Sequence, residues 1–289
     1  MNHRELIAGL TSIHGAGEAR AIVRLVAEER FGLSQTDLLL GKDTQLSADD
    51  RAEWEKIALR LLNGEPVQYV LGYADFCGHR FRVTPAVLIP RPETERIVEV
   101  IHPSSLTPQP IIDLCTGSGC IAISLALSVP DVHVIGVDIS AEALAVAREN
   151  AAALGAQNVT FLQGDVLRGE ALLEDLQAAC LSLPRFSVIT ANPPYVRTSE
   201  AAEISATVLD YEPHLALFVP DDDPLRFYRA IIAVARRCLV PEGTILVEIN
   251  AALADATRRL FLDSGFTDIK LHNDQFGRPR ILQTFNNKL

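Results

Sequence analysis

From Ile111 onward, short apolar stretches alternate with segments of helical periodicity, and this alternation constrains the fold more than any other feature. The expected strands are residues 111–115, 132–138, 159–163, 186–191, 244–249, 267–271 and 280–285. The expected helices between them are residues 121–129, 141–154, 224–239 and 251–264. Strands that alternate with helices require right-handed crossovers and a mostly parallel sheet covered on both faces. We therefore predict an α/β fold with seven strands.

The first 75 residues follow a different, helical pattern. Residues 19–31 place their apolar side chains on one face and their charged side chains on the other. Ser47 suits the N-cap of a second helix that ends at Gly64. β-Branched and aromatic residues then indicate a hairpin and connector, followed by a linker rich in Pro and Ser at residues 102–110. The predicted domains are residues 1–75 (helical), 76–109 (hairpin connector and linker) and 110–289 (α/β).

Composition narrows the class of protein. The 289 residues carry a formal charge of −11, which disfavours a general grip on the phosphate backbone of nucleic acids. The five cysteines are odd in number and contain no C-x-x-C pair, as is typical of reduced thiols rather than of a disulfide framework or structural zinc. We see no signal peptide and no apolar stretch long enough to span a membrane. Together with the pattern of the cysteines, this leads us to expect a cytoplasmic protein without a metal site.

The segment that follows the first expected strand has the pattern of a nucleotide-binding loop. The sequence Gly-x-Gly-x-x-Ala begins at Gly117 and fits the dinucleotide fingerprint. Asp138 ends the second strand 21 residues later, where a carboxylate can accept both ribose hydroxyls. Asp165 ends the third strand near the expected adenine, although an aspartate in a turn or N-cap fits equally well. The loop alone does not separate a nicotinamide or flavin cofactor from an S-adenosyl ligand.

The motif Asn192-Pro193-Pro194-Tyr195 follows the fourth expected strand, which we place beside the first. Proline after Asn192 keeps that residue extended, and the two prolines fix φ and remove backbone donors. The edge therefore presents carbonyl oxygens and one side-chain amide, while Tyr195 offers a flat face. These groups predict a pocket for a planar substrate with an exocyclic or amide nitrogen; a surface Asn-Pro turn is the alternative.

Together these motifs resemble those of class I S-adenosylmethionine-dependent methyltransferases that act on a planar nitrogen. Three further stretches narrow the resemblance to the peptide chain release factor glutamine methyltransferase family; these are residues 64–69 (GEPVQY), 88–95 (LIPRPETE) and 211–217 (YEPHLAL). The resemblance covers almost the whole chain and is weakest over the first 60 residues. The roles of Arg91, Glu93 and Thr94 within the second stretch do not follow from it.

The resemblance implies a Rossmann-like catalytic domain, a hairpin connector and a helical N-terminal domain that recognises the protein substrate. It implies methyl transfer from S-adenosylmethionine to the glutamine side-chain nitrogen in the Gly-Gly-Gln motif of release factors, by a cytoplasmic enzyme that modulates translation termination. Separately from the resemblance, we expect the protein to be a monomer. The implied cofactor-binding residues are Asp113, Cys115, Thr116, Gly117, Ser118, Gly119, Asp138, Asp165, Val166 and Asn192. The implied substrate-binding residues are Asn192, Pro193, Pro194 and Tyr195, of which Asn192, Pro193 and Tyr195 are catalytic.

Two residues depart from the pattern of that family. Cys115 stands where glycine is common, and Val166 stands where an aromatic side chain can flank the adenine. The nearest rival is a sister glutamine methyltransferase for a ribosomal protein, against which residues 91–95 favour the release-factor branch. A nucleic-acid base methyltransferase is opposed by the acidic charge, and a nicotinamide oxidoreductase has no use for the motif at Asn192. A non-catalytic binding module would not need the pocket residues.

Overall fold

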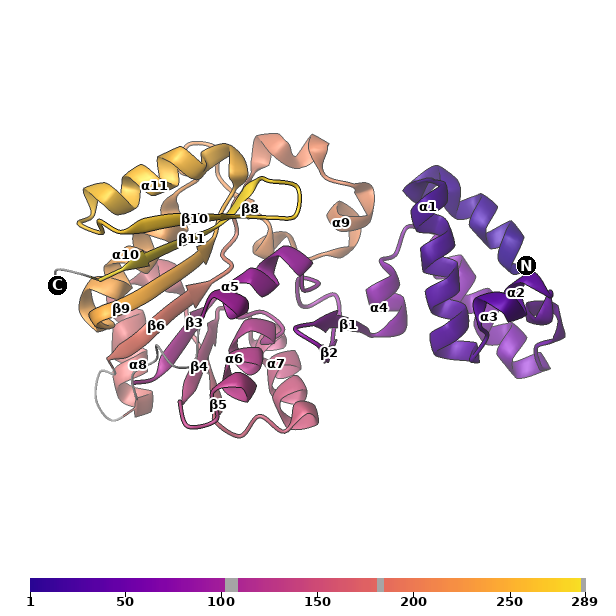
Figure 1. Ribbon diagram of the computed structural model, residues 1–289, viewed down its shortest axis with the longest axis horizontal. Coiled ribbons are helices and arrows are strands. Elements are labelled where there is room, and N and C mark those ends of the chain that lie inside the picture. Colours follow the sequence, from indigo (N-terminus) through magenta and orange to yellow (C-terminus); the bar gives the residue numbers. More distant parts are fainter. Residues whose placement is uncertain (102–108, 181–184, 287–289) are drawn as a thin grey trace. The chain divides into compact units, whose positions relative to one another are not determined.

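The computed structural model describes residues 1–101, 109–180 and 185–286, which form two compact units (Figure 1). The first unit combines Met1–Tyr73 with Ser205–Tyr211, and the second combines Ala74–Ile204 with Glu212–Leu289. The return of Ser205–Tyr211 to the N-terminal unit was not predicted. The predicted linker at residues 102–110 lies outside the described residues except for its last two positions. Within the described ranges, no helix combines the length and apolar character needed to cross a membrane.

The first unit is helical, as the sequence pattern indicates. Its helices are α1 (His3–Phe31), α2 (Gln35–Leu39), α3 (Ala48–Leu62), α4 (Val67–Leu71) and α9 (Ala206–Tyr211). The helix expected over residues 19–31 is the second half of α1, which contains a break at Gly15, where φ is 78°. Ser47 caps α3 as predicted, because its hydroxyl accepts the amide of Asp50 at 3.2 Å. The rings of Phe31 and Trp54 pack 5.4 Å apart in the core of this unit.

The second unit contains the predicted seven-stranded sheet. The strands are β3 (Ile111–Leu114), β4 (Val134–Asp138), β5 (Val159–Gln163), β6 (Phe186–Ala191), β9 (Leu239–Glu248), β10 (Ile269–Asn273) and β11 (Pro279–Phe285). They lie in the order β10-β11-β9-β6-β3-β4-β5, and only the pairs that include β11 are antiparallel. β9 begins at Leu239 rather than at the predicted Thr244. The α/β fold with a mostly parallel sheet is thus confirmed.

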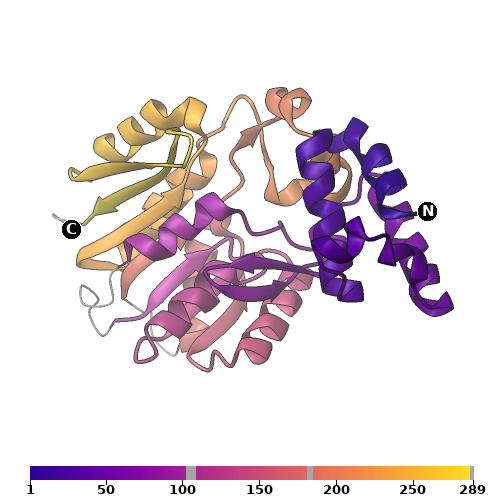
Figure 2. The same ribbon diagram turned by 45° about the vertical axis from the view of Figure 1, so that its right-hand side comes forward.

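Helices cover both faces of this sheet (Figure 2). Successive residues of a strand point to opposite faces, so Ile111 packs with one apolar cluster and Ile112 with the other. The cluster of Ile111 is closed by α5 (Glu95–Val100), α6 (Cys120–Ser128) and α7 (Ala141–Leu154). The cluster of Ile112 is closed by α8 (Glu170–Cys180), α10 (Arg226–Cys238) and α11 (Ala254–Asp263). Strands buried on both faces explain the continuous apolar stretches in the sequence.

Two small sheets complete the unit. The predicted hairpin is formed by β1 (Tyr73–Phe76) and β2 (His79–Arg82), joined at Cys77 and Gly78. Both turn residues have positive φ, 48° and 74°, which matches the right-handed twist of a tight hairpin. The rings of Phe76 and Phe81 pack edge to face across it at 6.0 Å. A second, parallel pair links β7 (Val196–Arg197) to β8 (Phe218–Val219).

The register of the central strands brings three segments to one edge of the sheet. Leu114 of β3 pairs with Ala191 of β6, and Ala191 pairs with Val247 of β9. The residues that follow these strands, Cys115 and Asn192, and the last residue of β9, Glu248, therefore come side by side. The chain reverses its strand order between β3 and β6, which is where open α/β sheets bind ligands.

Candidate functional site

Asp113 anchors the loop that follows β3. Its side chain is fully buried and accepts the hydroxyl of Thr116 at 2.5 Å and that of Thr190 at 2.7 Å. Burial raises the pKa of the Asp113 carboxyl to about 7, against the lowering effect of the two hydroxyls. Because Thr190 belongs to β6, these bonds join the loop to the neighbouring strand. Asp113 thus fixes the loop from its buried position in the sheet, and it is not among the residues that line the cavity in the described structure.

The backbone of this loop turns through three residues with positive φ. They are Cys115 at 60°, Gly117 at 55° and Gly119 at 79°. A Cβ on Gly119 would lie 2.9 Å from Cδ1 of Ile123 and 3.1 Å from Cβ of Ala147, so this glycine lets the loop pack against two helices. A Cβ on Gly117 would meet no described atom within 4 Å, so open space lies beside that part of the backbone. Cys115 is a non-glycine residue in a conformation that disfavours side chains.

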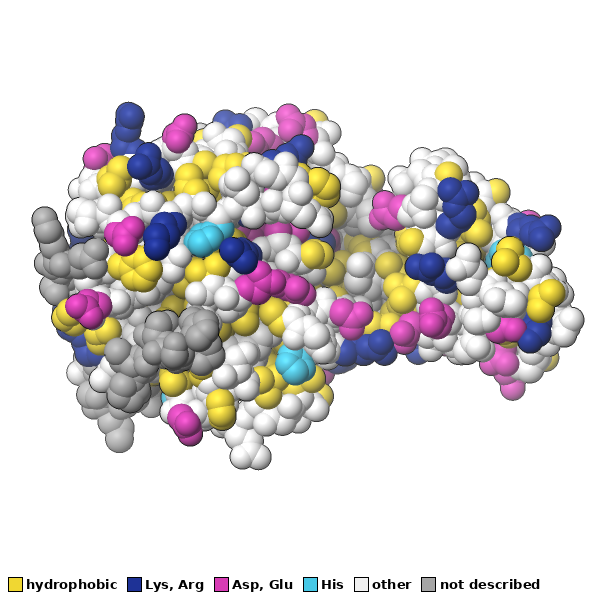
Figure 3. All heavy atoms as spheres, viewed as in Figure 1, with side chains coloured by type: hydrophobic (Ala, Val, Ile, Leu, Met, Phe, Trp, Pro, Cys, Tyr) yellow, Lys and Arg dark blue, Asp and Glu magenta, His cyan; other side chains and the backbone are white. Residues whose placement is uncertain are grey.

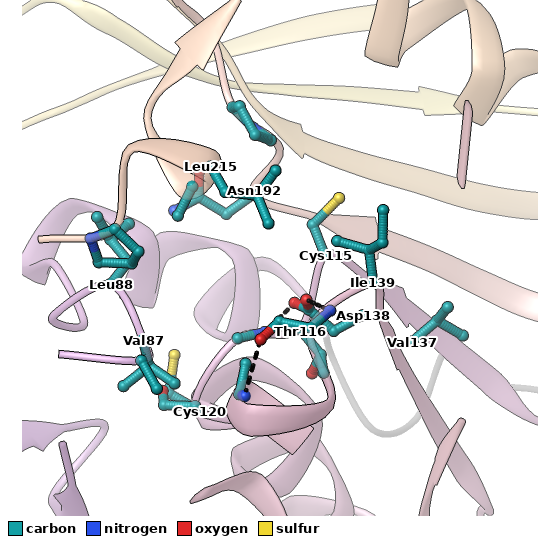
Figure 4. Close-up of a pocket in the computed structure, with 18 of the residues that line it drawn as sticks. Val87, Leu88, Cys115, Thr116, Cys120, Val137, Asp138, Ile139, Asn192 and Leu215 are labelled. Atoms are coloured by element: carbon teal, nitrogen blue, oxygen red, sulfur yellow. Dashed lines mark hydrogen bonds between the residues drawn. The ribbon is translucent and has the colours of Figure 1, made fainter. Parts of the chain in front are cut away.

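Asp138 ends β4 and closes the loop from the side. Its Oδ2 accepts the amide of Gly117 at 2.8 Å, and its Oδ1 accepts the amide of Ser140 at 2.9 Å (Figure 4). Burial raises the pKa of this carboxyl, and the backbone amides oppose the rise. Each oxygen keeps a second lone pair, so the carboxylate can accept from a ligand diol while it holds the loop.

Asp165 and Val166 follow β5 at the same edge. The Asp165 side chain accepts the amide of Leu167 at 2.9 Å and caps a short 3₁₀ helix, Val166–Arg168. The N-cap interpretation of Asp165 therefore applies, and the residue also lines the cavity. Val166 is buried and contributes an apolar side chain to the same wall.

The end of β6 places Asn192 next to the glycine loop. Its Nδ2 lies 3.3 Å from Oγ1 of Thr94, and the two prolines that follow are buried. The Tyr195 hydroxyl donates to Oε1 of Glu248 at 2.9 Å, and its ring packs against the core. Burial and the adjacent Glu248 raise the pKa of this phenol well above its ordinary value. Tyr195 therefore serves as a donor inside the protein, and its ring belongs to the packing behind the motif.

The connector that follows the hairpin also lines the cavity, through residues such as Arg91 and Thr94. Glu212 is almost fully buried, and its carboxylate accepts from the Ile89 amide at 3.1 Å and from the Arg91 guanidinium at 2.6 Å. An arginine–carboxylate pair with a second, backbone donor fixes the connector firmly. The stretches at residues 88–95 and 211–217, which are distant in sequence, are thus joined at the cavity. This gives Arg91 a structural role that the sequence left open.

These segments enclose a cavity of about 320 Å³. Figure 4 shows Asn192 beside Leu215, across the cavity from Val87 and Cys120. The predicted site residues in its described lining are Cys115, Thr116, Gly117, Ser118, Asp138, Asp165, Val166, Asn192 and Pro194. The candidates that lie outside this described lining are Asp113, Gly119, Pro193 and Tyr195. The first strand end and the fourth thus meet at one site, as the sequence indicates.

Two residues of this region were missed as candidates. Thr94 is buried, lines the cavity and contacts Asn192, while Glu248 is fully buried and accepts from the hydroxyls of Thr94 and Tyr195. The signal for Glu248 was present, because a carboxylate that ends an apolar strand (ILVE) needs partners inside the protein. Thr94 lies within the stretch at residues 88–95 that carries the resemblance, but its role was left open because nothing in the sequence names its partners.

Family models match both parts of the chain. A model described as methyltransferase domain matches residues 108–261, which is more than half of the chain. A model described as PrmC N-terminal domain matches residues 8–72. The first match lies in the α/β unit except for Ser205–Tyr211, and the second lies in the helical unit.

Curated relatives match along almost the whole chain. A release factor glutamine methyltransferase from Bacteroides thetaiotaomicron is 44% identical over 94% of this chain and 95% of its own. A release factor glutamine methyltransferase from Flavobacterium psychrophilum is 39% identical over 98% of this chain and 97% of its own. Among solved structures, TrmN from Thermus thermophilus is 20% identical over 67% of this chain and 48% of its own, with a TM-score of 0.47.

Proposed function

This chain belongs to the release factor glutamine methyltransferase family, and from that premise we propose its substrate and the roles of its residues. It transfers the methyl group of S-adenosylmethionine to the side-chain amide nitrogen of the glutamine in the Gly-Gly-Gln motif of a peptide chain release factor. This modification modulates translation termination. The observation that carries the proposal is the pairing of Leu114 with Ala191, which sets the amide acceptor Asn192 beside the glycine loop.

The cavity suits S-adenosylmethionine. The open space beside Gly117 leaves room for a ligand to approach the backbone, and Asp138 retains lone pairs for a ribose diol. Val166 and Ile139 supply apolar walls on which an adenine can pack, and Asp165 lies next to them. When it is bound, S-adenosylmethionine supplies a methyl group attached to a positively charged sulfur.

Asn192 and Pro193 prepare the acceptor nitrogen. An amide nitrogen is a poor nucleophile because its lone pair is delocalised into the carbonyl group. The side-chain oxygen of Asn192 and the carbonyl oxygen of Pro193 accept the two amide hydrogens, which aims the nitrogen and adds electron density to it. Alignment of this kind contributes on the order of several kcal/mol. The two acceptors also stabilise the positive charge that develops on the nitrogen. Methyl transfer leaves the nitrogen positively charged and still bearing both hydrogens. This cation is strongly acidic and loses one proton to water to give the neutral N-methylamide, so no protein base is needed.

Charge and thiol chemistry support the proposed partner and compartment. Acidic and basic side chains are interspersed on the face in Figure 3, and the net charge is −11, which favours a protein substrate over a nucleic acid. The cysteines at 77, 115, 120 and 238 are free thiols, as is typical of a reducing compartment. We propose that the protein acts in the cytoplasm, as a monomer.

The decisive experiment offers several acceptors side by side. Methyl transfer from labelled S-adenosylmethionine is measured into purified release factor, ribosomal protein and RNA. We expect label in the release factor, and its loss when the glutamine of the Gly-Gly-Gln motif is replaced. Label in ribosomal protein alone would move the chain to the sister activity, and label in RNA alone would overturn the proposal.

A further inference from the structure

Glu248 occupies an unusual position for a carboxylate. It ends β9 with 0% of its surface exposed, one strand away from Asn192. Its Oε2 accepts the Thr94 hydroxyl at 2.6 Å, and its Oε1 accepts the Tyr195 hydroxyl at 2.9 Å. An ionised carboxylate can only accept hydrogen bonds, so both hydroxyl protons are directed toward it.

The direction of the hydrogen bond from the Thr94 hydroxyl to Glu248 determines how the Asn192 amide is oriented. A threonine hydroxyl has one proton, and here it is given to Glu248. Toward Asn192 the Thr94 oxygen is therefore an acceptor, and the amide NH2 of Asn192 must face it, as the 3.3 Å contact from Nδ2 shows. The Asn192 carbonyl oxygen is consequently turned away from Thr94.

We propose that Thr94 and Glu248 are positioning residues that hold the Asn192 amide with its oxygen available to the substrate. The inference rests on the proposed function, in which that oxygen accepts a hydrogen from the substrate NH2 group. With the amide turned over, an N–H group of Asn192 would oppose an N–H group of the substrate, and the acceptor would be lost. Glu248 thus acts on the substrate through two intervening side chains and without touching it.

The surroundings of Glu248 indicate that its carboxylate does more than fill space in the core. Burying a carboxylate is costly unless it is fully hydrogen-bonded, and an apolar residue of similar size avoids that cost. Burial raises the pKa of Glu248, while the hydroxyls of Thr94 and Tyr195 lower it. Glu93 raises it further and Arg280 lowers it, and the Tyr228 hydroxyl donates to the Glu248 backbone carbonyl at 3.1 Å.

The test compares two substitutions at Thr94 under conditions in which the wild-type protein methylates the release factor. Thr94→Val keeps the shape but removes the hydroxyl, and we expect kcat to fall about 10- to 100-fold with cofactor Kd within about twofold of wild type. Thr94→Ser keeps the hydroxyl and should recover most of the loss. If Thr94→Val keeps the wild-type kcat, or if Thr94→Ser loses as much as Thr94→Val, the inference is overturned.

A matched control separates the hydroxyl's role from a general effect of the substitution. Thr284 of β11 is fully buried, its Oγ1 has no partner among the described atoms, and it lies outside the described cavity lining. Thr284→Val therefore removes a buried hydroxyl without touching Asn192, and it should leave kcat unchanged. A loss equal to that of Thr94→Val would overturn the inference, because the effect would then be one of folding.

Two double-mutant measurements complete the test. In an Asn192→Ala background, Thr94→Val should have little further effect on kcat, because there is no amide left to orient. Glu248→Gln can donate to Thr94 and so reverse the chain of bonds, and combining it with Thr94→Val should be markedly less than additive. Full additivity in either pair overturns the inference while leaving the proposed function intact. A wild-type protein that transfers no label to the release factor overturns both.

Discussion

The loop after β3 and the segment that follows β6 line one cavity but are held in place by different interactions. In the loop, Thr116 bonds to Asp113 three residues away, and Gly117 bonds to Asp138 21 residues away. At the edge, Asn192 contacts Thr94 98 residues away, and Thr94 contacts Glu248 154 residues away. Apart from the bond between Asp113 and Thr190 of β6, the loop depends on its backbone conformation and on residues near it in sequence. The edge depends on side chains that come from distant parts of the chain. Substitutions at the edge should therefore mainly lower the rate of methyl transfer, whereas substitutions in the loop should mainly weaken cofactor binding.

The largest effect is expected at the edge, from Asn192→Ala. Removing the side-chain acceptor leaves the substrate NH2 group unaligned, so methyl transfer should fall by about 10³-fold or more. Cofactor affinity, measured by calorimetry, should change little because the loop is untouched. Turnover near that of wild type would contradict the role assigned to Asn192.

The next effect is expected in the loop, from Asp138→Ala. The substitution removes the acceptor for Gly117 and the carboxylate offered to the ribose, so the Kd for S-adenosylmethionine should rise about 10- to 100-fold. At saturating cofactor the kcat should be largely retained. Asp131→Ala is the matched control, because Asp131 is an exposed acid outside the described lining and its loss changes the net charge equally. Equal Kd values for the two variants would remove Asp138 from the cofactor site.

A smaller effect concerns the anchor beneath the loop and its dependence on pH. The pKa of Asp113 is raised by burial from 3.8 to about 7 in the folded protein. A raised carboxyl pKa contributes stability that is fully present below pH 3.8 and is lost as pH rises through 7. Between pH 6 and 8 this group should lower the free energy of unfolding by roughly 1 kcal/mol. Asp113→Asn should flatten that part of the stability curve, measured by urea unfolding; an unchanged slope would contradict the shift.

The same difference between loop and edge explains what could be predicted from the sequence. The strand–helix alternation is a local pattern, so the sheet was predicted correctly. The spacing from Gly117 to Asp138 is also local, and the two residues are hydrogen-bonded at the end of the first strand. The neighbouring positions of Cys115 and Asn192 followed from the expected strand order. Thr94 and Glu248 could not be paired, because the bond between them depends on how β9 and the connector pack. That Ser205–Tyr211 belongs to the helical unit was not predicted either, because this too depends on packing between segments that are distant in sequence.

The smallest effect is expected at Cys115, where the loop keeps a side chain on a left-handed backbone. Its φ is 60°, a conformation that costs a non-glycine residue about 1 kcal/mol. Cys115→Gly removes that cost, whereas Cys115→Ala removes the thiol but keeps the cost. The glycine variant should therefore be more stable than the alanine variant by about 1 kcal/mol at most, since glycine also gains entropy in the unfolded chain. Equal stabilities in thermal unfolding would show that the strain at this residue is no larger than the entropy that glycine gains in the unfolded chain.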